Sequence, residues 1–322
     1  MTPSWKPLII GTSLVGAAAL LPLYLSSYNT SLLSLALIYS IAAMGQTVLT
    51  GTANLPSLGN SSFMLIGAWV SASFASDLHL PFLIAALLTV IVAGLVGVLV
   101  GLPALRISGL YLAIATIALV FVVQEVLGQV DIIAGRSGPT VTGPGWLSAD
   151  RGLFYSSLLL SAVITLLLWN LTRSRVGRAW LALRDSEAGA TASGISATRY
   201  KTLAFGVSAA VCAIAGVMIA QYDAGVSTAA FGLPVSLSLI AMAVIGGLGS
   251  FPGAYIGAFL ITLLPNILGA FPATIGSFQV HNASTLVSAL LLLLVLAFLP
   301  GGLWSLVDTA LTSLTQNRRD EE

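Results

Sequence analysis

Residues 177–201 read GRAWLALRDSEAGATASGISATRYK, and this stretch lies between two apolar runs at 153–171 and 202–221. The segment 173–201 holds six of the twelve lysine and arginine side chains of the chain. An apolar run of ~20 residues is long enough to cross a hydrocarbon core of ~30 Å as a helix. The sequence therefore predicts two membrane-spanning helices joined by a polar loop, 172–201, outside the bilayer.

The composition extends this pattern to the whole chain of 322 residues. Hydrophobic residues make up 57% of it and charged residues only 7%, whereas soluble domains are ~25% charged. So little charge cannot cover a water-facing globule, and a lipid bilayer is the expected solvent. The formal net charge of +1 gives no reason to expect a nucleic acid partner. Cys212 is the one cysteine, which excludes a disulfide framework and a thiolate metal site.

Apolar windows predict an all-α integral membrane protein with about ten transmembrane helices, one or two of them short or broken. We treat residues 1–322 as one membrane domain. The apolar run that follows Lys6 is long and leads into further apolar sequence, so we expect an uncleaved first span. The expected spans are 8–25, 31–50, 62–77, 81–101, 109–128, 153–171, 202–221, 235–249, 253–271 and 284–300.

The basic residues predict the orientation of these spans, because cytoplasmic loops carry an excess of Lys and Arg. With ten spans and Lys6 in the cytoplasm, ten of the twelve basic residues fall on the cytoplasmic side. Only Arg136 and Arg151 fall outside, in the Gly- and Pro-rich loop 129–152, which we expect to be an exterior lid or a flexible loop. Both termini are therefore predicted to be cytoplasmic. The predicted cytoplasmic loops are 50–61, 102–108, 172–201, 250–252 and the tail after residue 300.

The sequence lacks the usual energy sources of a transporter or an enzyme. Almost all acidic residues lie at span ends or in loops, and Glu125 is the deepest of them, whereas ion-coupled transporters usually need charged groups within their spans. No P-loop, H-E-x-x-H, Cys/His cluster or G-x-S-x-G motif is present. We therefore expect no catalytic residue, no metal and no cofactor bound by this chain. An ion-coupled secondary transporter and a membrane enzyme remain as alternatives.

The loop 172–201 contains good helix formers and ends its helical pattern at Gly194, which predicts a short polar helix. Arg184 and Glu187 are three residues apart and are expected to pair weakly. Arginines beside the spans can simply contact lipid phosphates, but this does not explain an insertion with its own helix. A docking helix for a soluble partner does. One stripe of this helix carries Trp180, Leu183, Glu187 and Thr191.

A second irregular segment, TGTANLPSLGNSS, runs from Thr50 to Ser62 and interrupts the apolar pattern with Pro56 and two glycines. Irregular backbone at membrane depth is tolerated only where protein or a cavity surrounds it. The segment is either part of a substrate path or an ordinary cytoplasmic turn. The candidate path residues are Asn54, Ser57, Asn60, Ser61 and Ser62.

Two further patterns concern packing. Gln46 and Gln124 are expected to join helices rather than to contact a ligand. The stretches LGNSSFMLIGAW (58–69) and LGSFPGAYIGAF (248–259) echo each other. The echo arises either from generic close packing of small residues or from a duplicated architecture. The glycines of GGLGSFPG (246–253) predict tight packing or a hinge.

From Met44 to Trp304 the chain resembles the LivM-type permeases of ABC importers for branched-chain amino acids. The matching stretches occur in the family's order at 44–69, 105–119, 177–216, 243–260 and 291–304. The resemblance implies alternating access and a multi-pass location in the bacterial cytoplasmic (inner) membrane. It also implies a second, LivH-type permease subunit, a soluble substrate-binding protein, and two ABC ATPase subunits that bind ATP and Mg.

The resemblance further implies that 177–201 contains the coupling helix, which fits a groove on the ATPase subunit. The residues carried over for this role are Arg178, Arg184, Glu187, Ala188 and Gly194. Asn60 departs from the family, which often has His at that position. The default substrates are leucine, isoleucine and valine, but similar permeases handle urea or short amides, so the substrate stays open.

Overall fold

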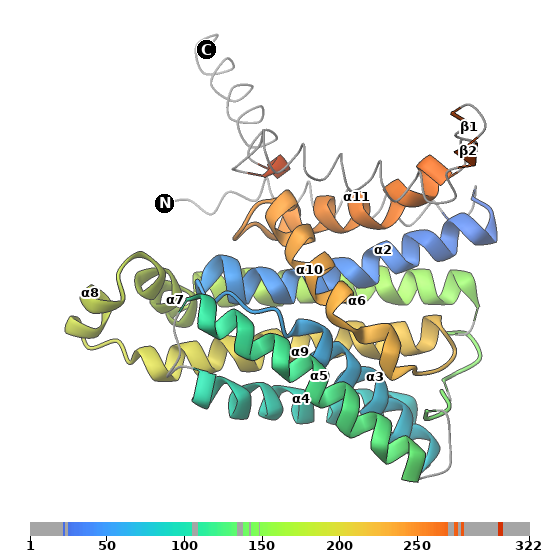
Figure 1. Cartoon of the computed structure of the whole chain (residues 1–322), viewed down its shortest axis with the longest axis horizontal. Coiled ribbons are helices and arrows are strands. Elements are labelled where there is room, and N and C mark those ends of the chain that lie inside the picture. Colours follow the sequence, from blue (N-terminus) through green and yellow to red (C-terminus); the bar gives the residue numbers. More distant parts are fainter. Residues whose placement is uncertain are drawn as a thin grey trace.

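The computed structural model describes residues 22, 25–104, 109–133, 138–141, 143–147, 149–269, 274–275, 278–279 and 302–304. Most of this part of the chain is helical, and the long helices lie roughly lengthwise beside one another (Figure 1). One two-residue strand pair, β1 (Thr274–Ile275) with β2 (Phe278–Gln279), is antiparallel. The long helices are α2 (Ser27–Gln46), α3 (Asn60–Ser76), α4 (Phe82–Ala104), α5 (Leu110–Ile133), α6 (Asp150–Arg173), α9 (Ala197–Tyr222), α10 (Leu233–Gly246) and α11 (Phe251–Gly269).

These eight helices match eight of the ten predicted spans within a few residues. The predicted spans 8–25 and 284–300 lie outside the described residues, apart from residues 22 and 25, so the total of ten stays a prediction. Within the described part, six helices are long and apolar enough to cross a membrane. The chain is therefore mainly α-helical with several membrane-span candidates.

Helix α9 occupies the centre of the bundle and packs on α2, α3 and α4. Small residues permit this close approach. A Cβ on Gly67 would lie 2.2 Å from the carbonyl oxygen of Ala213, and one on Gly216 would lie 1.9 Å from that of Met64. Backbones that touch in this way gain dispersion contacts, which in lipid replace the hydrophobic effect as the main attraction between helices. The α3–α9 crossing thus needs glycine on both helices.

Helix α4 carries an exposed apolar stripe at intervals of four residues. Leu83, Leu87, Ile91, Leu95 and Leu99 share one face and are each more than half exposed. A stripe of this length would be costly in water and is suited to a hydrocarbon environment. The outer face of the bundle at α4 therefore agrees with a membrane location.

The connections gather at two ends of the bundle. Gly51 and the turn at Gly249 lie at the same end as the polar loop 172–201, which protrudes on the left of Figure 1. The described part of the loop 129–152 lies at the opposite end, where Thr140 forms an isolated β-bridge with Gly225. This bridge joins the described part of the loop to the residues that follow α9.

Candidate functional site

The polar loop contains two helices where the sequence predicts one. Helix α7 spans Arg175–Asp185 and α8 spans Glu187–Ala192. Ser186 between them has an extended backbone, and its hydroxyl accepts a hydrogen bond from the Gly189 N–H at 3.1 Å. A serine hydroxyl that bonds nearby backbone competes with helix continuation and favours a new N-terminus. The single-helix prediction is therefore wrong at Ser186.

Helix α7 is fixed by its apolar face. Trp180 is fully buried, and its Nε1 donates a hydrogen bond to the carbonyl oxygen of Tyr200 at 2.7 Å. Ala179 and Leu183 are also buried. Since Tyr200 belongs to the first turn of α9, this hydrogen bond attaches α7 to the N-terminal end of that central helix.

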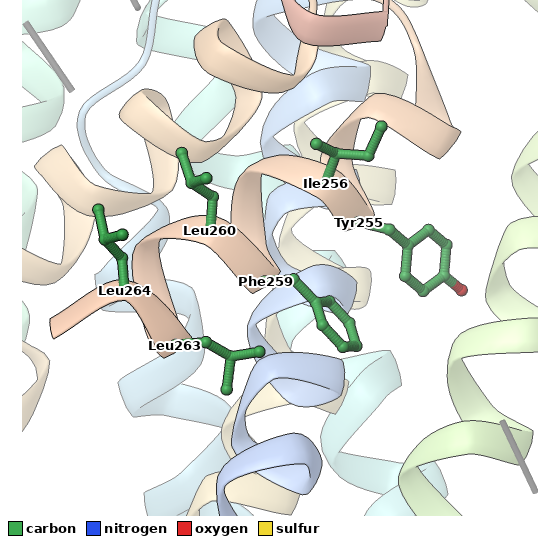
Figure 2. A pocket seen from close by; sticks show the side chains of 6 residues that line it. All are labelled: Tyr255, Ile256, Phe259, Leu260, Leu263 and Leu264. Atoms are coloured by element: carbon green, nitrogen blue, oxygen red, sulfur yellow. The ribbon is translucent and has the colours of Figure 1, made fainter. Parts of the chain in front are cut away.

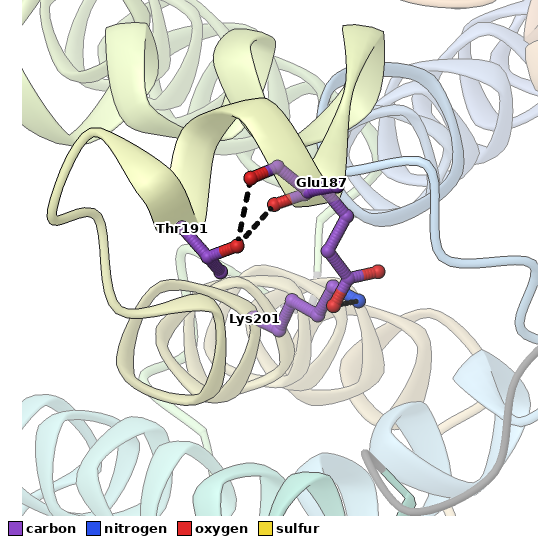
Figure 3. Close-up of polar contacts among 4 residues, drawn as sticks. Glu187, Thr191 and Lys201 are labelled. Atoms are coloured by element: carbon purple, nitrogen blue, oxygen red, sulfur yellow. Dashed lines mark hydrogen bonds and ion pairs between the residues drawn. The ribbon is translucent and has the colours of Figure 1, made fainter.

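An ion pair holds α8 against the same turn of α9. Glu187 Oε1 lies 2.7 Å from Lys201 Nζ, and the side chains are 56% and 17% exposed, respectively. Figure 3 shows this pair together with Thr191, whose Oγ1 donates to the carbonyl oxygens of Glu187 and Ala188. The predicted pairing of Glu187 with Arg184 is wrong, because the helix break turns Glu187 toward α9. An exposed pair contributes little to folding, but it orients α8.

The tip of the loop faces outward. Ala190 is the one buried residue of α8. Its carbonyl oxygen accepts the Ile195 N–H at 3.0 Å, which closes the turn behind α8. Gly194 has φ +84°, a left-handed conformation that glycine adopts without strain. The exposed residues of the tip are Glu187, Ala188, Gly189, Thr191, Ala192, Ser193 and Gly194.

Arg184 points to the bundle instead of the tip. Its Nη1 donates a hydrogen bond to the carbonyl oxygen of Gly51 at 2.9 Å. Gly51 belongs to the π-helix η1 (Thr47–Thr52), which continues α2. A Cβ on Gly51 would lie 2.3 Å from the nitrogen of Gly249, in the turn between α10 and α11. We call the meeting point of Arg184, Gly51 and Gly249 the inner junction.

The side chain of Arg178, the remaining coupling candidate, bonds to a residue close to it in the sequence. Its Nη1 donates to the carbonyl oxygen of Arg173 at 2.9 Å, and its side chain is exposed. Arg173 in turn lies over the ring of Trp169, with its Cζ 4.5 Å from the ring centroid. Arg178 therefore reinforces the corner between α6 and α7 rather than the tip.

The five candidate path residues divide into two groups. Asn54 is exposed, with φ +53°. The other four are completely buried, and these are Ser57, Asn60, Ser61 and Ser62. Ser57, Asn60 and Ser61 take part in hydrogen bonds between helices, whereas the hydroxyl of Ser62 donates to the nearby carbonyl oxygen of Gly59.

Asn60 is the centre of the buried polar network. Its Nδ2 donates to Gln46 Oε1 and, at 3.3 Å, to Ser208 Oγ on α9. Gln46 Nε2 donates to the carbonyl oxygen of Ser57 at 2.9 Å. The expectation that Gln46 joins helices is confirmed. Ser61 extends the network to α10, since Ser236 Oγ donates to Ser61 Oγ at 2.7 Å.

Two cavities lie away from this network. A recess of about 460 Å³ runs along one face of α11 and is apolar apart from the hydroxyl of Tyr255 (Figure 2). That hydroxyl lies 2.8 Å from Thr165 Oγ1. The recess presents no charged group, so it does not suit a charged solute. It is lined by Tyr255, Ile256, Phe259, Leu260, Leu263 and Leu264.

A smaller cavity of about 260 Å³ lies at the opposite end of the bundle from α7 and α8. We call it the outer cavity, after the exterior side that the sequence predicts for this end of the bundle. The outer cavity was not predicted from the sequence. Asp150, near the end of the Gly- and Pro-rich loop 129–152, is the sequence signal that could have indicated it. Asp223 lies one residue beyond Tyr222 of the lining, and partial burial raises the pKa of Asp223 above its ordinary value. The outer cavity is lined by Ser31, Leu147, Ala149, Asp150, Leu153, Gln221 and Tyr222.

Among the residues that the structure describes, no three His, Cys, Asp or Glu side chains are grouped so that they could hold a metal ion. The chain was compared with known proteins, and the model for the permease component of the branched-chain amino acid transport system matches residues 28–299. The chain belongs to this permease family. The inner junction and the outer cavity are thus features of a transport permease.

The relatives of this permease include both subunit types of one transport system. It is 31% identical to the high-affinity branched-chain amino acid transport system permease protein LivM of Escherichia coli (strain K12). That match covers 78% of this chain and 66% of LivM, so the chain spans just under two thirds of that relative. It is 25% identical to LivH of the same organism, over 82% of this chain and 90% of LivH.

A solved structure, PsaBC from Streptococcus pneumoniae in complex with Fab, is similar to this permease at 15% identity with a TM-score of 0.44. The alignment covers 84% of this chain and 91% of that chain. This likeness is too distant to support any argument.

Proposed function

We propose that this permease is a membrane-spanning subunit of an ATP-driven ABC importer for branched-chain or related amino acids. It works in the bacterial cytoplasmic membrane with a second, LivH-type permease subunit, two ABC ATPase subunits and a soluble substrate-binding protein. ATP and Mg are bound by the ATPases. The chain carries the solute path, and both of its termini lie in the cytoplasm.

The observation that carries this proposal is the geometry of α7 and α8. The tip is exposed, while three contacts behind it reach the bundle: Trp180 to Tyr200, Glu187 to Lys201, and Arg184 to Gly51. A helix that only met lipid headgroups would not need such connections. We propose that residues 172–201 form the coupling loop, in which Glu187, Ala188 and Gly194 shape the tip that docks on an ATPase.

In this proposal Arg178 and Arg184 serve the coupling without touching the ATPase. Arg178 stabilises the corner between α6 and α7, and Arg184 transmits a movement of α7 to the inner junction. The π-helix η1 at this junction supports the idea, because π-helical turns often occur at functional sites. A push on the tip would then reach α2, α9 and the α10–α11 turn together.

The break between α2 and α3 is proposed to change during transport. Ser57, Asn60, Ser61 and Ser62 are buried, so they would meet solute only when the break opens. Asn54 lies at its inner end. The support is the cost of burying polar groups: a network retained at this position is expected to have a role beyond packing.

Branched-chain amino acids are proposed as substrates because the family model and the relatives LivM and LivH carry that description. Asn60 replaces a histidine that is common in LivM-type permeases. Its Nδ2 is engaged with Gln46 and Ser208, whereas its Oδ1 is buried without a partner, so the choice among related solutes stays open.

The docking role is tested with Glu187→Lys in the assembled importer. We expect uptake of L-leucine and transport-stimulated ATP hydrolysis to fall at least tenfold, with normal amounts of the permease in the membrane. The matched control is the charge swap Glu187→Lys with Lys201→Glu, which restores the pair within the chain. If Glu187 contacts the ATPase, the swap stays inactive; full activity of Glu187→Lys alone would contradict the docking role.

A further inference from the structure

The outer cavity combines polar and apolar groups in a way that no other described cavity of this chain does. Leu147 and Leu153 are almost completely buried and form its apolar part. Asp150 and Ser31 lie on its polar side, where Ser31 Oγ donates to Asp150 Oδ1 at 2.9 Å. Gln221 and Tyr222 add an amide and a phenol from the end of α9.

The charge of Asp150 is suited to an ammonium group. Asp150 is exposed, and its carboxylate accepts a hydrogen bond from the hydroxyl of Ser31. A carboxylate keeps acceptor capacity beyond one hydrogen bond, and a charge-assisted bond to an ammonium is stronger than the bond to a neutral hydroxyl. A cationic amine can therefore bind Asp150 without breaking the contact with Ser31.

The same corner offers a place for a carboxylate. Helix α6 begins at Asp150, and its N-cap residue, Ala149, makes no side-chain capping bond. The first N–H groups of a helix have no partner within the helix, and the positive end of its dipole attracts anions. Groups for an ammonium, a carboxylate and an apolar side chain thus surround one small space.

The size of the outer cavity agrees with a small solute. At about 260 Å³ it lies just below the ~300–1,000 Å³ that is typical of sites for drug-sized ligands. It is formed by the ends of α2, α6 and α9, and each of these helices reaches the inner end beside α7 and α8. A solute bound there would touch the three helices on which the coupling loop also acts.

We propose that the outer cavity is a binding site for a zwitterionic aliphatic amino acid. Asp150, which keeps its hydrogen bond from Ser31, holds the ammonium group, the first turn of α6 holds the carboxylate, and Leu147 and Leu153 contact the side chain. The site is the first station on the path, and its binding is weak, as transfer requires. This inference rests on the proposed function.

The test uses a cysteine at the rim of the outer cavity. Cys212, the one native cysteine, is fully buried. Ala149→Cys places an exposed thiol beside Asp150, and Leu78→Cys places a matched thiol in another connection at the same end, where Leu78 is 59% exposed. The full chain in membranes is labelled with a membrane-impermeant maleimide at increasing L-leucine concentrations.

We expect L-leucine to slow labelling at Ala149→Cys but not at Leu78→Cys. In the Ala149→Cys background, Asp150→Asn is expected to raise the half-protecting concentration at least tenfold. Isoamylamine, which keeps the ammonium, should protect better than 4-methylpentanoate, which lacks it. No protection by L-leucine, equal protection at both cysteines, or no effect of Asp150→Asn would overturn the proposal.

Uptake of L-leucine by the assembled importer with the unsubstituted permease separates the two proposals. Uptake of L-leucine without protection of the cysteine contradicts the binding site in the outer cavity and leaves the proposed function standing. Protection of the cysteine without uptake supports ligand binding in the outer cavity and contradicts the proposed function.

Discussion

At the residue scale, several buried polar side chains of the described residues are hydrogen-bonded across helices, although Asn60 Oδ1 has no partner. Asn60, Gln46 and Ser208 form the clearest set, because their hydrogen bonds connect α2, α3 and α9. A buried polar group that loses its partner costs more than the bond itself contributes. Such residues therefore fix the relative positions of helices that apolar contacts alone would let slide.

Replacing Asn60 by leucine removes both donated hydrogen bonds and leaves Gln46 Oε1 without this donor. We expect the free energy of unfolding to fall by ~1–2 kcal/mol. The measurement is SDS-induced unfolding of the purified chain in detergent micelles. Asn54→Gly is the control, since Asn54 is exposed with φ +53° and glycine accepts that conformation. Equal stability of Asn60→Leu and the wild type would contradict the structural role of the network.

The α3–α9 crossing gives a second prediction at this scale. Gly67→Val places side-chain atoms where the backbone of Ala213 lies, so the helices must separate. We expect a severe loss of folded protein, measured by gel-filtration yield after detergent extraction. The control is Gly145→Ala, because nothing lies within 4 Å of a Cβ there. Normal yield of Gly67→Val would show that the crossing is looser than described.

At the element scale, α7 and α8 have different tasks. Helix α7 is attached to the bundle by Trp180 and Arg184, while α8 exposes most of its surface. The break at Ser186 makes this division possible, since it lets the tip turn independently of the attached helix. A single continuous helix would have pointed Glu187 toward Arg184 and away from α9.

The substitution Arg184→Met tests this division of tasks between α7 and α8. It removes the donor to Gly51 but retains a long apolar side chain, so folding and docking on the ATPase should survive. We expect uptake to fall at least tenfold while the ATPases still copurify and hydrolyse ATP, whereas Glu187→Lys should reduce the stimulated hydrolysis itself. The control is Arg175→Met, because Arg175 is an exposed arginine of the same helix. Normal uptake by Arg184→Met would show that the inner junction does not take part in the coupling.

The sequence predicted the elements better than their contacts. Hydropathy located the eight long described helices because a helix that crosses a lipid bilayer needs a long apolar run. It could not locate the break at Ser186, because the three-residue spacing of Arg184 and Glu187 also fits an ion pair on one continuous helix. It also missed the outer cavity, whose lining comes from residues as distant in sequence as Ser31 and Tyr222. Which helix ends meet depends on tertiary packing, and a single sequence does not contain that information directly.

At the scale of the whole molecule, the connections separate into two chemically different ends. One end carries α7, α8 and the inner junction, and the other carries the outer cavity and the described part of the 129–152 loop. The basic residues predict that the first end is cytoplasmic. Under the proposed function, the ATPases act at one membrane surface and the solute enters at the other.

Single cysteines test the orientation. Thr191→Cys on α8 should react with an impermeant maleimide only in inside-out vesicles, and Ala149→Cys only in intact right-side-out cells. Cys212 adds no background because it is buried. Labelling of both variants from the same side would contradict the topology and with it the docking of α8 on a cytoplasmic ATPase.

The central claim is that this permease receives its driving force from ATPases through α7 and α8. The most direct measurement is uphill accumulation of L-leucine in proteoliposomes, with a proton or Na⁺ gradient present in every sample. We predict accumulation only when the second permease, the ATPases, the binding protein and ATP are all included, and its loss with Glu187→Lys. Accumulation by the permease alone, driven by the ion gradient, would contradict the account.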